Sequence, residues 1–182
     1  MCLQIVAIHA EPKLFDSYYN GCCNGTFWPL FHSMPDRATF IANHWRAYIK
    51  INEEFAEKTI RALKLLKDSK EKNCNSPPII WVHDYHLMLA ANWIRQKAEE
   101  DELKCKLAFF LHIPFPPWDI FRLFPWSDEV LQGILGEVLF VLDKNDESLQ
   151  YIITSDNNNN LFYVSIQNIL IVTQVVTWSV SI

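Results

Sequence analysis

The sequence has few glycines and no surplus of positive charge. Only four of its 182 residues are glycine, and no two of them are adjacent. Loops that bind phosphate through backbone N–H groups need glycine for a close approach, so such a loop is not expected here. Lysine and arginine number 16 against 21 acidic residues, which gives a formal net charge of −5. Nucleic-acid binding is therefore not expected either.

The sequence also lacks Cys-x-x-Cys pairs and a basic leader. An odd number of cysteines, five in all, without such a leader is typical of reduced thiols in the cytoplasm, where we expect the protein. The apolar run at residues 3–8 is too short for export and fits a strand. Half of the residues are hydrophobic, enough for one domain with a sizeable core.

Residues 79–86 organise the rest of the chain. The β-branched and aromatic residues at 79–82 predict a buried strand, and residues 87–100 have a helical pattern. A second strand is predicted at residues 107–111. This βαβ unit, with a right-handed crossover, predicts an α/β fold with a Rossmann-like parallel sheet and flanking helices. Ligands bind outside the carboxyl ends of such strands, where Asp84 and His112 are expected.

Residues 11–31 have the composition of a loop. The two Asn-Gly pairs, at residues 20–21 and 24–25, are turn signals. The segment is unusually rich in tyrosine, tryptophan and phenylalanine for a loop. These aromatic side chains must either pack onto the body of the domain or line a pocket.

A long amphipathic helix is predicted after this segment, with Asp36 as its N-cap. Apolar residues recur at three- and four-residue steps from Ile41 to Leu66, which predicts a face that packs on the core. Two short helices are predicted at residues 118–124 and 128–135, separated by Pro125.

The composition changes near Gly136. No lysine or arginine follows Lys144, and residues 161–182 form an apolar, β-branched run. A membrane span, a tail foreign to the fold and genuine strands are all open interpretations. Internal amide side chains and the missing basic flank argue against a membrane span. We therefore expect a partial domain at residues 1–136 and a divergent tail at residues 137–182.

Five candidate functional side chains each have an alternative interpretation. Asp84 could accept hydrogen bonds from sugar hydroxyls or cap the following helix, and the sequence favours neither. His112 could bind a ligand or satisfy backbone carbonyls. Trp28 could stack on a sugar, but a core position is favoured. His83 and His86 could be metal ligands, yet a strand-to-helix corner separates them and no third ligand is suitably spaced, so no metal is expected.

Four motifs in this order resemble the trehalose-phosphate synthases. They are residues 18–21 (Tyr-Tyr-Asn-Gly), 24–32 (Asn-Gly-Thr-Phe-Trp-Pro-Leu-Phe-His), 81–86 (Trp-Val-His-Asp-Tyr-His) and 110–116 (Phe-Leu-His-Ile-Pro-Phe-Pro). The resemblance extends from about His9 to Gly136. It implies part of the N-terminal, acceptor-side half of a GT-B glycosyltransferase, whose two Rossmann-like domains face each other across a cleft.

The resemblance also implies an activity and roles for individual residues. Enzymes of this family transfer glucose from UDP-glucose to glucose 6-phosphate with retention, without a metal or other cofactor. Tyr19 and Asp84 match residues that hold glucose 6-phosphate, and His112 matches a residue beside the donor glucose. Trp28 and Ile113 match residues that select the α-anomer of the acceptor. The leaving phosphate is thought to assist transfer, so no carboxylate nucleophile is expected.

Some family features are missing from this sequence. The family has an earlier strand with a Gly-Gly loop that meets the donor phosphates, and a nucleotide-binding domain with basic residues. This chain has no Gly-Gly pair, and its last quarter contains only one basic residue, Lys144. We therefore expect the chain alone to be inactive. The alternatives to an enzyme fragment are a regulatory partner that binds sugar phosphate or a full-length synthase, and a non-functional truncated product.

Overall fold

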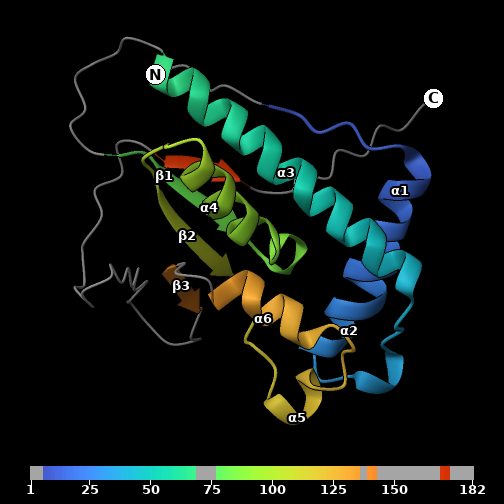
Figure 1. Ribbon diagram of the computed structural model, residues 1–182. Coiled ribbons are helices and arrows are strands. Elements are labelled where there is room, and N and C mark those ends of the chain that lie inside the picture. The colour runs from blue at the N-terminus through green and yellow to red at the C-terminus, as the bar shows by residue number, and fades with distance from the viewer. Residues whose placement is uncertain (1–5, 69–76, 136–138, 143–168, 173–182) are drawn as a thin grey trace.

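The core of the structure is a parallel sheet with helices packed against it (Figure 1). The computed structural model describes residues 6–68, 77–135, 139–142 and 169–172. Its sheet has the strand order β3-β2-β1-β4, and the paired strands are parallel. The strands are β1 (Ile79–His83), β2 (Lys106–Leu111), β3 (Leu139–Leu142) and β4 (Ile169–Val172). The predicted α/β fold class is confirmed.

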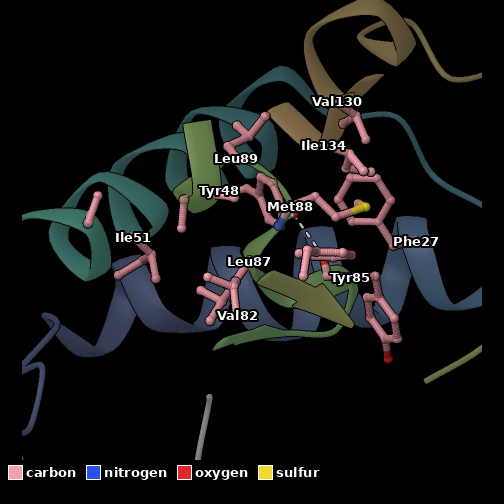
Figure 2. Close-up of a cluster of buried hydrophobic side chains, with 14 of the residues drawn as sticks. Phe27, Tyr48, Ile51, Val82, Tyr85, Leu87, Met88, Leu89, Val130 and Ile134 are labelled. Carbon is pink, nitrogen blue, oxygen red and sulfur yellow. Dashed lines mark hydrogen bonds between the residues drawn. The ribbon is translucent and has the colours of Figure 1, made fainter. Parts of the chain in front are cut away.

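The predicted strand–helix–strand unit is confirmed around β1. The chain leaves β1 through a short 3₁₀ turn, η3 (Tyr85–Leu87), forms α4 (Ala90–Glu100) and returns as β2. Side chains alternate along β1, with Ile80 and Val82 fully buried. These two side chains belong to the main core, which also takes in α4 and the long helix α3 (Ala42–Asp68) (Figure 2).

Residues 12–31 are helical, so the prediction of a loop was wrong. They form α1 (Pro12–Asp16), the π-helical segment η1 (Ser17–Phe27) and α2 (Trp28–Phe31). The turn signals were overridden by tertiary packing, because Tyr18 and Phe27 are fully buried in the core. Gly21 has a packing role, since a Cβ there would lie 2.6 Å from the His44 ring on α3.

The strand predicted at residues 3–8 is absent over its described part, residues 6–8. Residues 6–8 have no regular secondary structure in the described part of the chain, and residues 3–5 lie outside it. The prediction was therefore wrong for Val6–Ile8. An apolar run this short forms a strand only where a neighbouring strand pairs with it.

The long helix begins at Ala42, not next to Asp36 as predicted. Residues Pro35–Arg37 form one 3₁₀ turn, and Ala38 is extended. The Thr39 N–H donates to the Gly25 carbonyl at 2.9 Å, and the Thr26 hydroxyl donates to the Thr39 carbonyl. These bonds hold the chain extended and delay the helix. The centre of the apolar stripe is buried as predicted, whereas Ile41 and Leu66 at its ends are exposed.

The two short helices are confirmed as α5 (Trp118–Phe121) and α6 (Ser127–Leu135). Beyond them the structure describes only β3 and β4, which pair with β2 and β1. The remainder of residues 137–182 lies outside the described residues, so the interpretation of this segment as a divergent tail stays a prediction. In the described part of the chain, no helix has the length and apolar character needed to cross a membrane.

Candidate functional site

Asp84 lies immediately after β1, at the carboxyl edge of the sheet. Its N–H donates to the Phe110 carbonyl of β2 at 2.7 Å, which fixes its position between the two strands. Its backbone has φ 71° and ψ 166°, a conformation that is almost restricted to glycine and costs about 1–3 kcal/mol in other residues. Such strain persists where the surroundings enforce it, and it is most common at functional sites.

The Asp84 carboxylate has one occupied and one unoccupied oxygen. Oδ2 lies 3.2 Å from His86 Nδ1, while Oδ1 is buried and has no hydrogen-bond partner among the described residues. The side chain is 23% exposed and makes no capping hydrogen bond to η3. The geometry therefore does not support the alternative that Asp84 is a helix cap. A buried carboxylate oxygen normally has a donor, so Oδ1 is suited to accept a ligand hydroxyl.

Asp84 is ionised at neutral pH. Burial by itself would raise the pKa of the carboxyl group. The hydrogen bond and charge of His86 have the opposite effect, as do the Tyr85 N–H and His112, and together they hold the pKa of Asp84 below its ordinary value. A carboxylate accepts hydrogen bonds but repels other anions. Asp84 can therefore contact the hydroxyl groups of a sugar phosphate but not its phosphate group.

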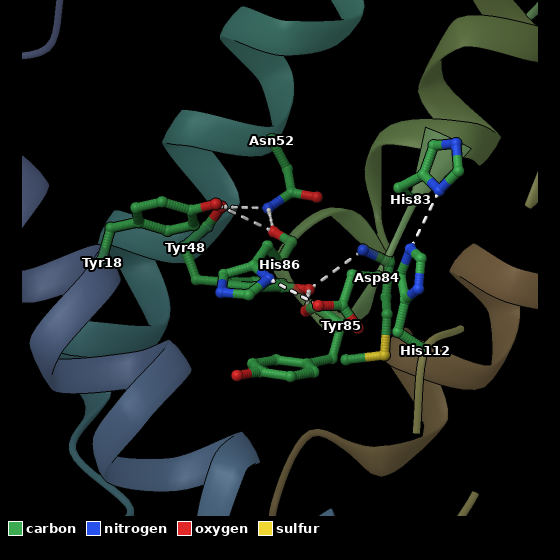
Figure 3. Close-up of polar contacts among 9 residues, drawn as sticks. Tyr18, Tyr48, Asn52, His83, Asp84, Tyr85, His86 and His112 are labelled. Carbon is green, nitrogen blue, oxygen red and sulfur yellow. Dashed lines mark hydrogen bonds and ion pairs between the residues drawn. The ribbon is translucent and has the colours of Figure 1, made fainter. Parts of the chain in front are cut away.

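Two tyrosine hydroxyls hold the turn that follows Asp84 (Figure 3). Tyr48 of α3 donates to the Tyr85 carbonyl at 2.7 Å and accepts from the Met88 N–H at 3.0 Å. Tyr18 of η1 donates to the His86 carbonyl at 3.1 Å. The backbone beyond Asp84 is thus attached to two helical segments that are distant in sequence.

Asn52 of α3 is a third attachment point, which the sequence analysis missed. Its side chain is fully buried. Nδ2 donates to the His86 carbonyl at 3.0 Å, and Oδ1 accepts from the N–H groups of Leu89 and Ala90 at 3.2 and 3.1 Å. Asn52 therefore caps the start of α4. The only signal in the sequence was an asparagine four residues after Tyr48, on the apolar side of the helix.

Tyr19 is brought to Asp84 through His86. The Tyr19 ring stacks on the His86 ring with their centroids 5.8 Å apart and 16° between their planes. His86 in turn contacts the Asp84 carboxylate. The two residues expected to hold glucose 6-phosphate therefore both contact the His86 imidazole, Tyr19 at the ring face and Asp84 at Nδ1. Sequence analysis considered His86 only as a metal ligand. The described residues contain no group of three or more His, Cys, Asp or Glu side chains that could hold a metal ion.

His112 follows β2 and is exposed, at the same edge of the sheet as Asp84. Its Nε2 lies 3.1 Å from Nδ1 of His83, the last residue of β1. This nitrogen is therefore engaged by another side chain and not by a backbone carbonyl. Phe110 packs its edge against the ring, with a centroid distance of 4.5 Å. The position suits contact with a ligand above the sheet edge.

Trp28 and Ile113 lie in two different surroundings. Trp28 begins α2, is 42% exposed and stacks on His32 at a centroid distance of 4.0 Å. The favoured core position for Trp28 was therefore wrong, because the buried residues of α2 are the three that follow it. Ile113 is half-buried and packs against the main core. Within the described residues the Trp28 ring stacks on His32 and makes no ring contact with Tyr19 or His112.

Comparison with known proteins shows a consistent set of relatives. The model of glycosyltransferase family 20 matches residues 2–177. The chain is 40% identical over 130 residues to an α,α-trehalose-phosphate synthase (UDP-forming) of Candida albicans. This match covers 71% of the present chain and 25% of the Candida protein. The chain is 42% identical over 141 residues to a bifunctional trehalose-6-phosphate synthase/phosphatase of Thermoproteus tenax, covering 76% and 17% of the two chains.

Solved structures give the same result. A UDP-forming α,α-trehalose-phosphate synthase from Burkholderia vietnamiensis is 33% identical with a TM-score of 0.55, and the match covers 68% of this chain and 24% of that one. The enzyme from Burkholderia xenovorans in complex with glucose-6-phosphate is 27% identical with a TM-score of 0.61, covering 74% and 26%. The chain thus spans about a quarter or less of the length of these relatives.

Proposed function

The chain belongs to glycosyltransferase family 20, and we propose that it forms part of the acceptor-side domain of an α,α-trehalose-phosphate synthase. The proposed reaction is the transfer of glucose from UDP-glucose to glucose 6-phosphate with retention of configuration. UDP-glucose is the donor substrate, and the proposal includes no metal ion or other cofactor. The buried, unpaired Oδ1 of Asp84 at the carboxyl end of β1 carries the proposal.

Asp84 and Tyr19 would bind the sugar part of glucose 6-phosphate. The ionised Asp84 carboxylate would accept a hydrogen bond from a sugar hydroxyl, and Tyr19 would flank the same ligand from η1. His112 would contact the donor glucose from the end of β2. Because β1 and β2 are neighbours in the sheet, these roles bring donor and acceptor sugars together above a single edge. Trp28 and Ile113 would select the anomer of the acceptor.

A chimeric synthase tests this proposal. In the chimera, residues 9–136 of this chain replace the matching segment of the Candida albicans enzyme. We expect the chimera to release UDP and form trehalose 6-phosphate at no less than about a tenth of the parent rate, since the catalytic contacts are retained. A folded chimera with no activity above background would refute the proposed function. Circular dichroism and thermal melting establish whether it is folded.

A second candidate is a chain that binds sugar phosphate or a full-length synthase without catalysing transfer. Such a chain would use the same acceptor-side residues, Asp84 and Tyr19, without a donor-binding loop. Co-purification of the chain with a full-length synthase would support this candidate over the first. We place either form in the cytoplasm, where the free thiols of Cys22, Cys23 and Cys105 would stay reduced.

The isolated 182-residue chain is expected not to turn over UDP-glucose. It offers no glycine-rich loop for the pyrophosphate. Its last quarter has a single basic residue, Lys144, to stabilise the departing UDP, so the electrostatic contribution that is usually the largest in catalysis is missing. The measurement is UDP release and trehalose 6-phosphate formation with both sugars supplied. Product above the no-enzyme control that disappears in an Asp84→Ala variant would contradict this expectation.

Trp28→Ala is expected to impair acceptor selection more than stability. Trp28 is 42% exposed, so the free energy of unfolding should change by less than about 1 kcal/mol, well below the ~3–5 kcal/mol of a buried aromatic. In the chimera, the preference for the α-anomer of glucose 6-phosphate over its β-anomer should fall. Trp118→Ala, at a tryptophan that is 55% exposed, is the matched control and should leave discrimination unchanged. Unaltered selection in the Trp28 variant would remove Trp28 from the site.

A further inference from the structure

His83 and His112 form a pair of imidazoles at the edge of the sheet. His83 ends β1, and His112 follows the last residue of the neighbouring strand β2. Nδ1 of His83 lies 3.1 Å from Nε2 of His112, and the rings stack with centroids 5.3 Å apart and 21° between their planes (Figure 3). The proposed function gives a role to His112 but none to His83.

The hydrogen bond between these nitrogens couples the tautomers of the two rings. A neutral imidazole has one nitrogen that donates and one that accepts. If His83 donates from Nδ1, His112 accepts at Nε2 and carries its own proton on Nδ1. If His112 donates from Nε2, His83 accepts at Nδ1 and carries its proton on Nε2. In both arrangements the two rings have the same tautomer.

The surroundings keep the pair from taking up two protons. With both rings protonated, two N–H groups would face each other at the 3.1 Å contact, and two positive charges would repel. Burial lowers the pKa of His83, and His112 lowers it further, while Asp84 has a smaller opposing effect. Within the described residues, the other rings that contact His83 are the uncharged side chains of Trp81 and Phe110. His83 is therefore neutral at pH 7 and can set the hydrogen bonding of its neighbour.

We propose that His83 is a positioning residue that holds the His112 ring in one orientation and couples its tautomer to that of His83, so that the pair together sets whether Nδ1 of His112 donates or accepts a hydrogen bond toward the donor sugar. The contact with the donor sugar rests on the proposed function, whereas the shared tautomer depends only on the geometry of the pair. In a histidine ring, the hydrogen bond that one nitrogen makes determines whether the other nitrogen carries the proton. His83 supplies that bond here.

The deciding experiment is imidazole NMR of the full 182-residue chain. Two-bond ¹H–¹⁵N spectra at pH 7.5 are expected to show His83 and His112 in one and the same tautomer. In His83→Phe, which retains a stacked ring but has no hydrogen bond, His112 should change to the averaged signals of two exchanging tautomers. His9→Phe, at an exposed histidine, is the matched control and should leave His112 unchanged. Different tautomers in the two rings, or an unaltered His112 in His83→Phe, would overturn the proposal.

A kinetic measurement in the chimera separates positioning from general stability. His83→Phe should lower kcat by about tenfold, the order expected from a small misplacement of a contacting group, with the KM for glucose 6-phosphate changed less than twofold. His83→Asn, whose amide can occupy the place of Nδ1, should recover most of the rate. Equal losses in both variants would overturn the role of His83 in catalysis. If the chimera is inactive but NMR shows that the two rings share a tautomer, the proposed function is refuted and the coupling between His83 and His112 is established.

Discussion

Replacing Asp84 with alanine in the chimera is expected to lower kcat/KM for glucose 6-phosphate ten- to a hundredfold. A hydrogen bond to a charged group contributes about 1.5–3 kcal/mol, which corresponds to this range. Asp84→Asn preserves the shape of the side chain and leaves the backbone strain as it is, so a comparable loss in this variant would assign the effect to the charge. The measurement is initial rate against acceptor concentration. Asp119→Ala, at an aspartate whose side chain is 86% exposed, should have no effect.

Asp84→Gly separates the function of Asp84 from its contribution to stability. Glycine is unstrained at φ 71°, so the relief of backbone strain should offset the lost contact with His86. The free energy of unfolding should therefore fall by no more than about 1 kcal/mol, although activity is lost. Acceptor kinetics that are unchanged in folded Asp84 variants would refute the assignment of Asp84 to the acceptor site.

The lowered pKa of Asp84 determines the direction in which fold stability and acceptor binding change with pH. A carboxyl group whose pKa is lower in the folded state stabilises the fold above its unfolded pKa, and this contribution disappears as the pH falls through the folded pKa. Acceptor binding through the Asp84 carboxylate should therefore persist throughout the neutral range. An acidic limb near pH 6 that vanished in Asp84→Asn would contradict this assignment.

Asn52→Ala is expected to lower the free energy of unfolding by about 3–5 kcal/mol. Two buried backbone N–H groups, of Leu89 and Ala90, lose the acceptor that the structure gives them, and the His86 carbonyl loses a donor. Each buried group left unsatisfied costs about 1–3 kcal/mol. The expected loss is a large part of the free energy of unfolding of a domain, which is usually about 5–15 kcal/mol. Urea unfolding of the full chain measures the change.

Two further variants make the expectation for Asn52 specific. Asn43→Ala, at an exposed asparagine of the same helix, should change stability by less than about 0.5 kcal/mol. Tyr48→Phe removes the bonds to the Tyr85 carbonyl and the Met88 N–H while preserving the ring, so it should cost about 2–6 kcal/mol. A loss below about 1 kcal/mol in Asn52→Ala would show that the turn after Asp84 does not depend on this side chain.

The sequence was sufficient for the central strands and for the edge on which the site lies. Residues 79–82 and 107–111 are short apolar runs bounded by polar residues or proline. Such a run can be identified as a buried strand from the local sequence alone. Parallel strands end at one edge, so the sequence alone places Asp84 and His112 at the same edge of the sheet. The four motifs pointed to the family, and the family comparison agrees.

Only the tertiary structure decided how the surrounding segments support that edge. Residues 11–31 carry turn signals, yet they are helical from Pro12 because burying Tyr18 and Phe27 in the core outweighs local preference. Asn52 is indistinguishable from a surface asparagine until a turn more than thirty residues further along folds against it. Local pattern determines which residues form a strand or helix, whereas a hydrogen-bond partner distant in sequence is set by the packing of the whole domain.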